Sequence, residues 1–220
     1  MDKIELIKEA IEKAKNHQSK MDEKAWSVPA LSSLKIRHLM NNLGAISTRY
    51  FECGVHVGGL FSSTIRNNPN LTIATANDSF ESDVTNGDPV EPRFYDNVNK
   101  CLCPETKFSM LKGDTFKIDP KEVSGPIDLY LFDADHSYES QRKAITHFLS
   151  SMADEFIVCV DDADWEDVIK GTQDGIVDSG CEVLFEDAFA GGDHDNETWW
   201  NGFYVALLRK KKEKKTKKEK

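Results

Sequence analysis

The sequence lacks the features that mark a secreted or membrane-embedded protein. Its five cysteines are an odd number and form no Cys-x-x-Cys pair, which argues against a disulfide framework. No apolar run approaches the length of a membrane-spanning helix. Residues 1–20 are charged throughout and lack the apolar centre of a signal peptide. We therefore expect a cytoplasmic protein without a membrane span.

Acidic residues outnumber basic ones outside the carboxyl-terminal end. Residues 209–220 carry nine basic and two acidic side chains, a net charge of +7. The whole chain has a net charge of −10, so residues 1–208 carry −17. An acidic body is a poor binder of nucleic acid, and only this tail is suited to touch nucleic acid, an acidic partner or a membrane surface. The tail has no apolar residues, and a disordered, solvated end is the simpler interpretation.

Two amphipathic helices are predicted before the first strand. Apolar residues recur at helical spacing from Ile4 to Ala14 and again from Leu31 to Leu43. A chain of 220 residues suits one α/β domain. We therefore divide it into an amino-terminal helical cap (residues 1–48), an α/β domain (residues 49–208) and the basic tail (residues 209–220). The cap is suited to serve as a lid or as a dimer contact.

Apolar strands alternate with helical segments from Arg49 onward, which is typical of βα units and a parallel sheet. The predicted strands are Tyr50–Val55, Leu71–Ala76, Lys107–Leu111, Ile127–Phe132 and Phe156–Val160. The helical segments are Phe61–Arg66, Arg93–Cys101, Tyr138–Met152 and Trp165–Ser179. Two further strands, Cys181–Glu186 and Gly202–Leu208, have no helical pattern between them and predict an antiparallel edge hairpin. The fold class is α/β, a Rossmann-like doubly wound sheet of about seven strands, mostly parallel.

Acidic residues follow two of the most apolar strands. Asp133 comes directly after Ile127–Phe132, and Asp161 and Asp162 come after Phe156–Val160. Ligands bind at the carboxyl ends of strands in an open parallel sheet, where these carboxylates would converge. Because they repel one another, we expect protons or a hard divalent cation between them. Capping of the next helix, or simple exposure to water, is the plainer alternative.

A glycine-rich turn follows the first strand. Glu52 ends the strand, and Gly54 and Gly58 open the turn and the next helix, where backbone N–H groups can approach a nucleoside. Packing of helix on strand would need the same glycines. The turn lacks the third glycine of the dinucleotide fingerprint, which disfavours a nicotinamide-dependent oxidoreductase. Asp78 and Asp114 follow the next two strands. Asp78 stands where nucleoside-binding α/β folds hold the ribose hydroxyl groups. Asp114 is either a ligand of the adenine amino group or a helix cap.

The order of these motifs resembles that of class I S-adenosylmethionine-dependent methyltransferases, over residues 49–209. The branch that it resembles contains the macrocin-type and the caffeoyl-CoA or catechol O-methyltransferases. Its first motif, Glu-x-Gly-x-x-x-Gly, is matched by Glu52, Gly54 and Gly58. Its fourth strand ends in Asp-x-Asp with a nearby Tyr, as in residues 133–138, and its fifth ends in two metal-binding residues, matched by residues 161–162.

The resemblance implies a role for each matched residue. S-adenosylmethionine would be bound by Glu52, Gly54, Gly58, Asp78, Asp114 and Asp133. A divalent cation, Mg²⁺ by its oxygen ligands, would be held by Asp133, Asp161 and Asp162. Asp133 and His136 are the catalytic candidates, and His136 stands where catechol-type enzymes carry a lysine base. A surface histidine that caps the next helix is the alternative for His136.

Two long loops are candidates to cover this site or are ordinary surface connections. They span residues 78–92 and 188–200. In the second loop, Asp193, His194 and Asp195 form either a second metal site or a flexible polar segment. Its Trp199 and Trp200, with Trp165 after the metal-type acids, either line an acceptor pocket or seal the sheet edge.

The leading hypothesis is a metal-assisted O-methyltransferase that acts on a small hydroxylated molecule. The alternative is a catalytically silent methyltransferase-fold module that engages a partner through the basic tail. We expect a small-molecule acceptor, no nucleic acid except through the tail, and a homodimer if the amino-terminal helices serve as its contact.

Overall fold

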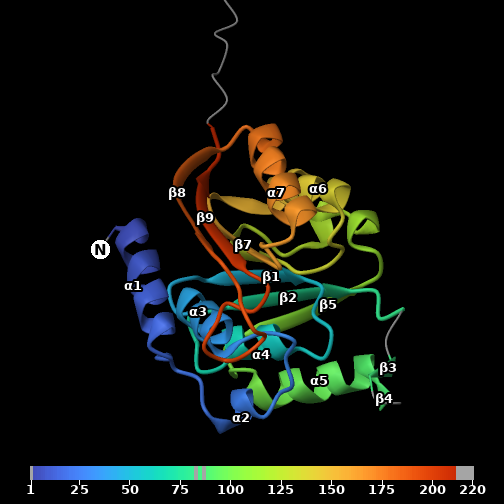
Figure 1. Ribbon diagram of the computed structural model, residues 1–220. Helices are drawn as coiled ribbons and strands as arrows, with labels where there is room; N and C mark the ends of the chain where they lie inside the picture. The colour runs from blue at the N-terminus through green and yellow to red at the C-terminus, as the bar shows by residue number, and fades with distance from the viewer. Residues whose placement is uncertain (1, 82–83, 86–87, 212–220) are drawn as a thin grey trace, which may run out of the picture.

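A seven-stranded sheet separates two layers of helices in the computed structural model, which describes residues 2–81, 84–85 and 88–211 (Figure 1). The sheet order is β5-β2-β1-β6-β7-β9-β8. Its strands are β1 (Arg49–Cys53), β2 (Ile73–Asp78), β5 (Lys107–Lys112), β6 (Ile127–Phe132), β7 (Met152–Asp161), β8 (Glu182–Phe189) and β9 (Phe203–Arg209). A separate two-stranded pair is formed by β3 (Val84–Thr85) and β4 (Asp88–Pro89).

Strand direction follows the prediction. The pairs from β5 to β7 are parallel, and β9 is antiparallel to both β7 and β8. The carboxyl-terminal hairpin therefore forms one edge of the sheet, with β9 inside and β8 outside. The chain leaves β1 toward β2 on one side and reaches β6 on the other, so the strand order reverses between β1 and β6. A ligand crevice is expected at such a reversal.

Helices cover both faces of the sheet, as a doubly wound fold requires (Figure 1). The helices are α1 (Lys3–Lys15), α2 (Glu23–Trp26), α3 (Leu34–Gly44), α4 (Gly59–Ile65), α5 (Val90–Cys101), α6 (Tyr138–Phe148) and α7 (Glu166–Ser179). Three short 3-10 turns are η1 (Thr115–Lys117), η2 (Pro120–Glu122) and η3 (Leu149–Ser151). Apolar residues of α1, α3, α4 and α5 form one core cluster with the sheet, and those of α6 and α7 form the other.

Several element boundaries differ from the sequence-based expectation, and three of these differences have a clear local cause. Strand β1 ends at Cys53 because Gly54 adopts a positive φ of 87°. Helix α6 ends at Phe148, and the 3-10 turn η3 tightens the last turn before β7. Helix α3 begins only at Leu34, because the Ser33 side chain accepts the N–H of Ile36 and caps it. Leu31 therefore lies outside the helix and is 72% exposed.

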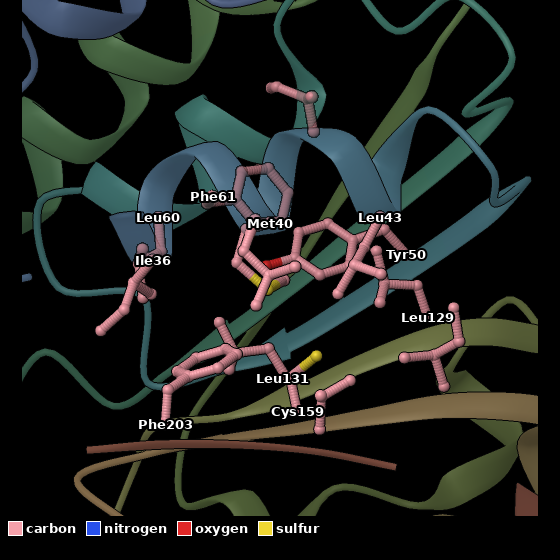
Figure 2. Packing of buried hydrophobic residues seen from close by; sticks show 14 of the residues in the cluster. Ile36, Met40, Leu43, Tyr50, Leu60, Phe61, Leu129, Leu131, Cys159 and Phe203 are labelled. Carbon is pink, nitrogen blue, oxygen red and sulfur yellow. The ribbon is translucent and has the colours of Figure 1, made fainter. Parts of the chain in front are cut away.

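The amino-terminal helices share the core of the α/β domain. Figure 2 shows Ile36 and Met40 of α3 beside Phe61 of α4, above Leu131 of the sheet. Polar contacts join the same segments: Arg37 is buried and donates from Nε to Ser63 Oγ at 2.8 Å. The described residues of the basic tail end at Lys211, so the remainder of that prediction lies outside them.

We expect Phe61→Ala to lower the free energy of unfolding by about 3–5 kcal/mol, the usual cost of removing a buried aromatic ring. Phe61 is fully buried, and its ring centroid lies 5.4 Å from that of Tyr50 and 5.7 Å from that of Phe108. Val177 is 75% exposed, and Val177→Ala should change stability by less than about 0.5 kcal/mol. Urea denaturation measures both, and equal losses would contradict this packing.

His38 gives the amino-terminal helices a pH-dependent stability. Burial, and then His17 and Arg37, lower the pKa of His38 to about 4. The unfolded side chain titrates near about 6.5, so on acidification the unfolded chain takes up the proton first. The contribution is complete above pH 6.5 and is lost as the pH falls to about 4. Between pH 7 and 5 the wild type should lose on the order of 1–2 kcal/mol more than His38→Gln in urea titrations. If the free energy of unfolding fell equally with pH in the wild type and in His38→Gln, this account would be wrong.

Candidate active site

The carboxyl ends of the parallel strands open into one cavity of about 870 Å³. It lies over the reversal between β1 and β6. The cavity is lined by five of the acids that the sequence singled out and by the first glycine of the turn: Glu52, Gly54, Asp78, Asp114, Asp133 and Asp162. His136 lines it too, and Gly58 immediately precedes the lining residues Gly59 and Leu60. Residues far apart in the chain therefore meet at one edge of the sheet.

The turn after β1 is shaped by two glycines with positive φ. Gly54 has φ 87° and lies so close to β6 that a Cβ atom on it would be 1.9 Å from the carbonyl oxygen of Asp133. Gly58 has φ 85° and forms the N-cap of α4. Both backbone conformations are strained for other residues. The turn therefore brings the α4 amino terminus and the end of β6 to the same side of the cavity.

Glu52 lies at the base of the cavity. Its side chain accepts a hydrogen bond from the Tyr50 hydroxyl and is only 1% exposed. Burial raises the pKa of Glu52 well above its ordinary value, and the nearby Asp133 and Asp78 raise it further. A buried carboxyl group of this kind is stabilised when a positively charged or hydrogen-bond-donating ligand reaches it.

Asp78 and Asp114 are held by backbone N–H groups. Asp78 accepts from the N–H of His56 at 2.8 Å and from that of Phe80 at 2.9 Å. Asp114 caps the short turn η1 by accepting the N–H of Phe116 at 3.0 Å, and its Oδ2 lies 3.3 Å from Lys117 Nζ. The helix-cap alternative for Asp114 is thus realised, while its side chain still belongs to the cavity wall.

Asp133, His136 and Asp162 bring their ligand atoms together. Nε2 of His136 lies 2.8 Å from Oδ2 of Asp162 and 3.7 Å from Oδ1 of Asp133. One ligand atom from each residue lies within 4.8 Å of the other two, which is the spacing of a metal-binding group. Asp162 adopts a positive φ of 55°, an uncommon conformation for a non-glycine residue, and this turn directs the chain toward α7.

Asp161 does not join that group in the described part of the chain. It is 2% exposed, and its Oδ1 accepts the N–H of Asp162 at 3.1 Å. Burial raises the pKa of Asp161 well above its ordinary value, and Asp133 and Asp162 raise it further. The sequence grouped Asp133 with Asp161 and Asp162, whereas the structure brings His136 to the two outer carboxylates.

His136 carries the positive charge between these carboxylates. Asp133, and then Asp162, raise the pKa of His136 to about 10. Burial raises the pKa of Asp133 to about 6. For Asp162, contacts with His136 and Asn201 outweigh burial and lower its pKa. In this arrangement the two carboxylates therefore favour the protonated imidazole.

The group fits a divalent cation. Nε2 of His136 is buried and makes no hydrogen bond of good geometry among the described residues, although two carboxylate oxygens lie close to it. Two carboxylates and an imidazole are common ligands of divalent metals. A cation there would replace the histidine proton as the charge between the acids, because a metal ligand must be deprotonated.

Residues 188–201 fold back onto this group. Asn201 donates from Nδ2 to Asp162 Oδ1 at 2.7 Å, and the N–H of Gly191 donates to Asp164 Oδ2 at 2.7 Å. Asp195 accepts the N–H of Glu197 at 2.8 Å, which is a local turn. The imidazole of His194 stacks on Trp200 with ring centroids 4.8 Å apart. These contacts are those of a polar loop, and Asp193, His194 and Asp195 do not come together as a metal-binding group among the described residues.

The three tryptophans that the sequence placed near the site divide between pocket and sheet edge. Trp165 is 48% exposed, lines the cavity and lies 5.0 Å from the His136 ring, centroid to centroid. Trp200 also lines the cavity. Trp199 is 9% exposed and stacks on Phe189 with centroids 4.3 Å apart, so it seals the sheet edge.

The segment before α3 supplies wall residues that were not predicted from the sequence. Pro29, Ala30, Leu31 and Ser32 line the cavity. Ala30 packs so closely on Gly59 that a Cβ on that glycine would lie 2.5 Å from the Ala30 Cβ. The cap residue Ser33 was the available signal that the helix begins later and leaves this segment free to form a wall. Asn201 carried no motif and was also missed.

Comparisons with known proteins identify the fold. No protein-family model and no curated protein matches the sequence. Among solved structures, the O-methyltransferase TomG from Streptomyces achromogenes, involved in tomaymycin synthesis and bound to S-adenosylmethionine, is similar at TM-score 0.61 and 16% identity, over 91% of this chain and 90% of that one. An O-methyltransferase from Bacillus cereus with S-adenosylhomocysteine gives 0.61 and 13%, over 93% and 91%.

A third structure agrees with these two. The methyltransferase PaMTH1 from Podospora anserina, bound to S-adenosylhomocysteine, is similar at TM-score 0.59 and 12% identity, over 94% of this chain and 88% of that one. The likeness extends over nearly the whole length of each protein. The chain therefore has the fold of class I methyltransferases, as the order of its motifs predicted.

We expect Gly54→Ala to lower the free energy of unfolding by more than about 3 kcal/mol, because the new Cβ would overlap the Asp133 carbonyl. Gly180→Ala is the matched control. Gly180 also has a positive φ, 65°, but beyond its chain neighbours no atom lies within 4 Å of the position that a Cβ would take. Its cost is therefore the conformational one of about 1–2 kcal/mol. Thermal and urea denaturation compare the two variants. Equal costs would show that the close approach of β1 and β6 is unimportant.

Proposed function

We propose that this chain is an S-adenosylmethionine-dependent O-methyltransferase that acts on a small hydroxylated molecule with the help of a divalent cation such as Mg²⁺. One observation carries the proposal. The glycine turn after β1 and the group of Asp133, His136 and Asp162 share one cavity at the strand reversal. Cofactor and acceptor would thus meet there in a fold that binds S-adenosylmethionine in other proteins.

The cofactor half of the cavity offers a partner for each part of the cofactor. In this proposal Glu52, with the N–H groups of the turn from Gly54 to Gly58, holds the methionine portion at the α4 amino terminus. Asp78 accepts the ribose hydroxyls, since its carboxylate is already fixed by two backbone donors. Asp114, on the cavity wall, accepts a hydrogen bond from the adenine amino group.

The acceptor half supplies position and charge. A divalent cation held by Asp133, His136 and Asp162 would lower the pKa of a coordinated hydroxyl group and make it the better nucleophile. Asp161 lies directly beside these residues as a further ligand candidate. The protein's own part is to hold the acceptor oxygen in line with the methyl group, since the departing thioether leaves neutral and positioning supplies most of the rate.

His136 has two roles open to it in this proposal. Without a cation it is the protonated partner of Asp133 and Asp162 and does not act as a base. With the carboxylates neutralised by a metal, the cause of its raised pKa is removed, and the imidazole becomes either a metal ligand or a base near neutral pH.

Cofactor binding is the first test. Calorimetry should give dissociation constants at or below high micromolar values for S-adenosylmethionine and S-adenosylhomocysteine, since the cavity is preformed. Asp78→Asn should weaken both about tenfold, because it removes the charge that receives the ribose. Asp187→Asn, an exposed acid on β8, is the control and should bind as wild type. Lack of binding by the wild-type protein would refute the proposal.

Metal dependence is the second test. Asp162→Asn should weaken Mn²⁺ binding at least tenfold, measured by calorimetry or water-proton relaxation, and leave S-adenosylhomocysteine binding within twofold. Asp161→Asn should also lower turnover strongly while the cofactor still binds. A chelator should abolish transfer to hydroxylated acceptors, and Mg²⁺ should restore it.

Two outcomes would contradict the metal-dependent reaction. Turnover that is insensitive to chelator and to Asp162→Asn would show that the reaction does not use a cation. Cofactor binding without metal dependence and without transfer to any acceptor would instead support the catalytically silent module. The part of the basic tail on which that alternative relies lies mostly beyond the described residues.

A further inference from the structure

A chain of side-chain contacts runs from the loop between β8 and β9 to the proposed metal group, Asp133, His136 and Asp162. Nε2 of His194 lies within hydrogen-bond distance of Asn201 Oδ1, and Asn201 Nδ2 donates to Asp162 Oδ1 at 2.7 Å. The other carboxylate oxygen of Asp162, Oδ2, lies 2.8 Å from His136 Nε2. Asp162 is therefore held from two sides, and the proposed function gives no role to the two loop residues.

The direction of each hydrogen bond in this chain follows from the chemistry of its members. An ionised carboxylate has only acceptor atoms, so the Asn201 amide must turn its NH₂ group, and not its oxygen, toward Asp162. The amide oxygen is thereby left facing His194, and it can only accept. His194 must then donate from Nε2, which requires a form of the imidazole that carries a hydrogen there. The ring thus holds the amide in the orientation that serves the carboxylate.

The imidazole of His194 is itself held by Trp200. The two rings are stacked, with centroids 4.8 Å apart and an interplanar angle of 19°. Both residues adopt a positive φ, 43° for His194 and 55° for Trp200, which is uncommon outside glycine. Trp200 also lines the cavity. The ring that faces Asn201 therefore has a defined place in the loop.

The backbone beside Asn201 is anchored to the turn that follows β7. The N–H of Asp164 donates to the carbonyl oxygen of Asn201 at 2.9 Å, and that of Ala163 donates to the carbonyl oxygen of Gly202 at 3.2 Å. Gly202 has φ 88°, and a Cβ on it would lie 2.6 Å from the backbone nitrogen of Asp164. The backbone of Asn201 is thus fixed beside the proposed metal group, and the imidazole sets only the direction of the amide.

We propose that His194 and Asn201 are a positioning pair for Asp162: the imidazole orients the amide, and the amide holds Oδ1 of the carboxylate so that Oδ2 stays on the side of His136. This inference rests on the proposed function and adds to it two residues that act through a metal ligand. Removing a partner of a metal ligand commonly lowers metal affinity about ten- to hundredfold. The loop would therefore contribute to cation affinity without supplying a ligand.

Titration of the full chain with Mn²⁺ tests the pair, by calorimetry or water-proton relaxation without cofactor. Asn201→Ala should weaken Mn²⁺ binding about tenfold, because Asp162 loses the donor on Oδ1. His194→Ala should weaken it about three- to tenfold, because the amide is then free to turn. His194→Gln should stay within about twofold of wild type, since the glutamine NH₂ group can donate to Asn201 from nearly the same place as Nε2.

A double variant separates positioning from a general loss of loop structure. If His194 acts only through Asn201, the combination of His194→Ala with Asn201→Ala should bind Mn²⁺ within about twofold of Asn201→Ala alone. Affinity for S-adenosylhomocysteine should change less than about twofold in each variant, because the cavity keeps its shape. Asn196→Ala, at an exposed position of the same loop, is the control and should bind Mn²⁺ as wild type does.

The inference fails on any of four results. These are wild-type Mn²⁺ affinity in Asn201→Ala, losses that multiply in the double variant, a loss in His194→Gln as large as in His194→Ala, and an equal loss of S-adenosylhomocysteine affinity. If Asp162→Asn weakens Mn²⁺ binding while the loop variants do not, only the positioning pair is refuted. If the wild-type protein binds no Mn²⁺, the metal-dependent reaction is refuted, and the positioning pair is refuted with it.

Discussion

The close approach of the turn after β1 to the end of β6 is the constraint on which the site depends. Gly54 has no side chain, and its Cα can therefore lie against the carbonyl group of Asp133. The turn that would hold the cofactor and the strand that carries the first metal-type acid are thus fixed at one point. Every other candidate residue takes its place relative to that contact, because β1 and β6 are the central parallel strands at the reversal.

The carboxylates at this edge repel one another, and positive charge nearby is needed to offset that repulsion. His136 compensates part of it as the protonated neighbour of Asp133 and Asp162. The remaining negative charge suits positively charged ligands, namely the sulfonium cofactor and a metal ion.

Segments outside the βα units complete the wall. Residues 29–32 reach the cavity because Ser33 caps α3 and stops the helix short. Residues 188–201 reach it because Asn201 and Gly191 bond to side chains at the end of β7. Lys35 at the start of α3 also donates to the carbonyl oxygen of Glu197, so these two covering segments touch each other.

The sequence by itself determined the layers, the number of strands in the main sheet and the edge hairpin, since apolar period and strand-end acids are local properties. It also identified Glu52, Asp78 and Asp133 as residues of one edge. Tertiary structure alone decided that His136, and not Asp161, joins the two outer carboxylates, and that Asn201 fixes one of them. Those choices depend on the direction of single side chains at the ends of strands, which packing between distant segments sets and which no spacing along the chain records.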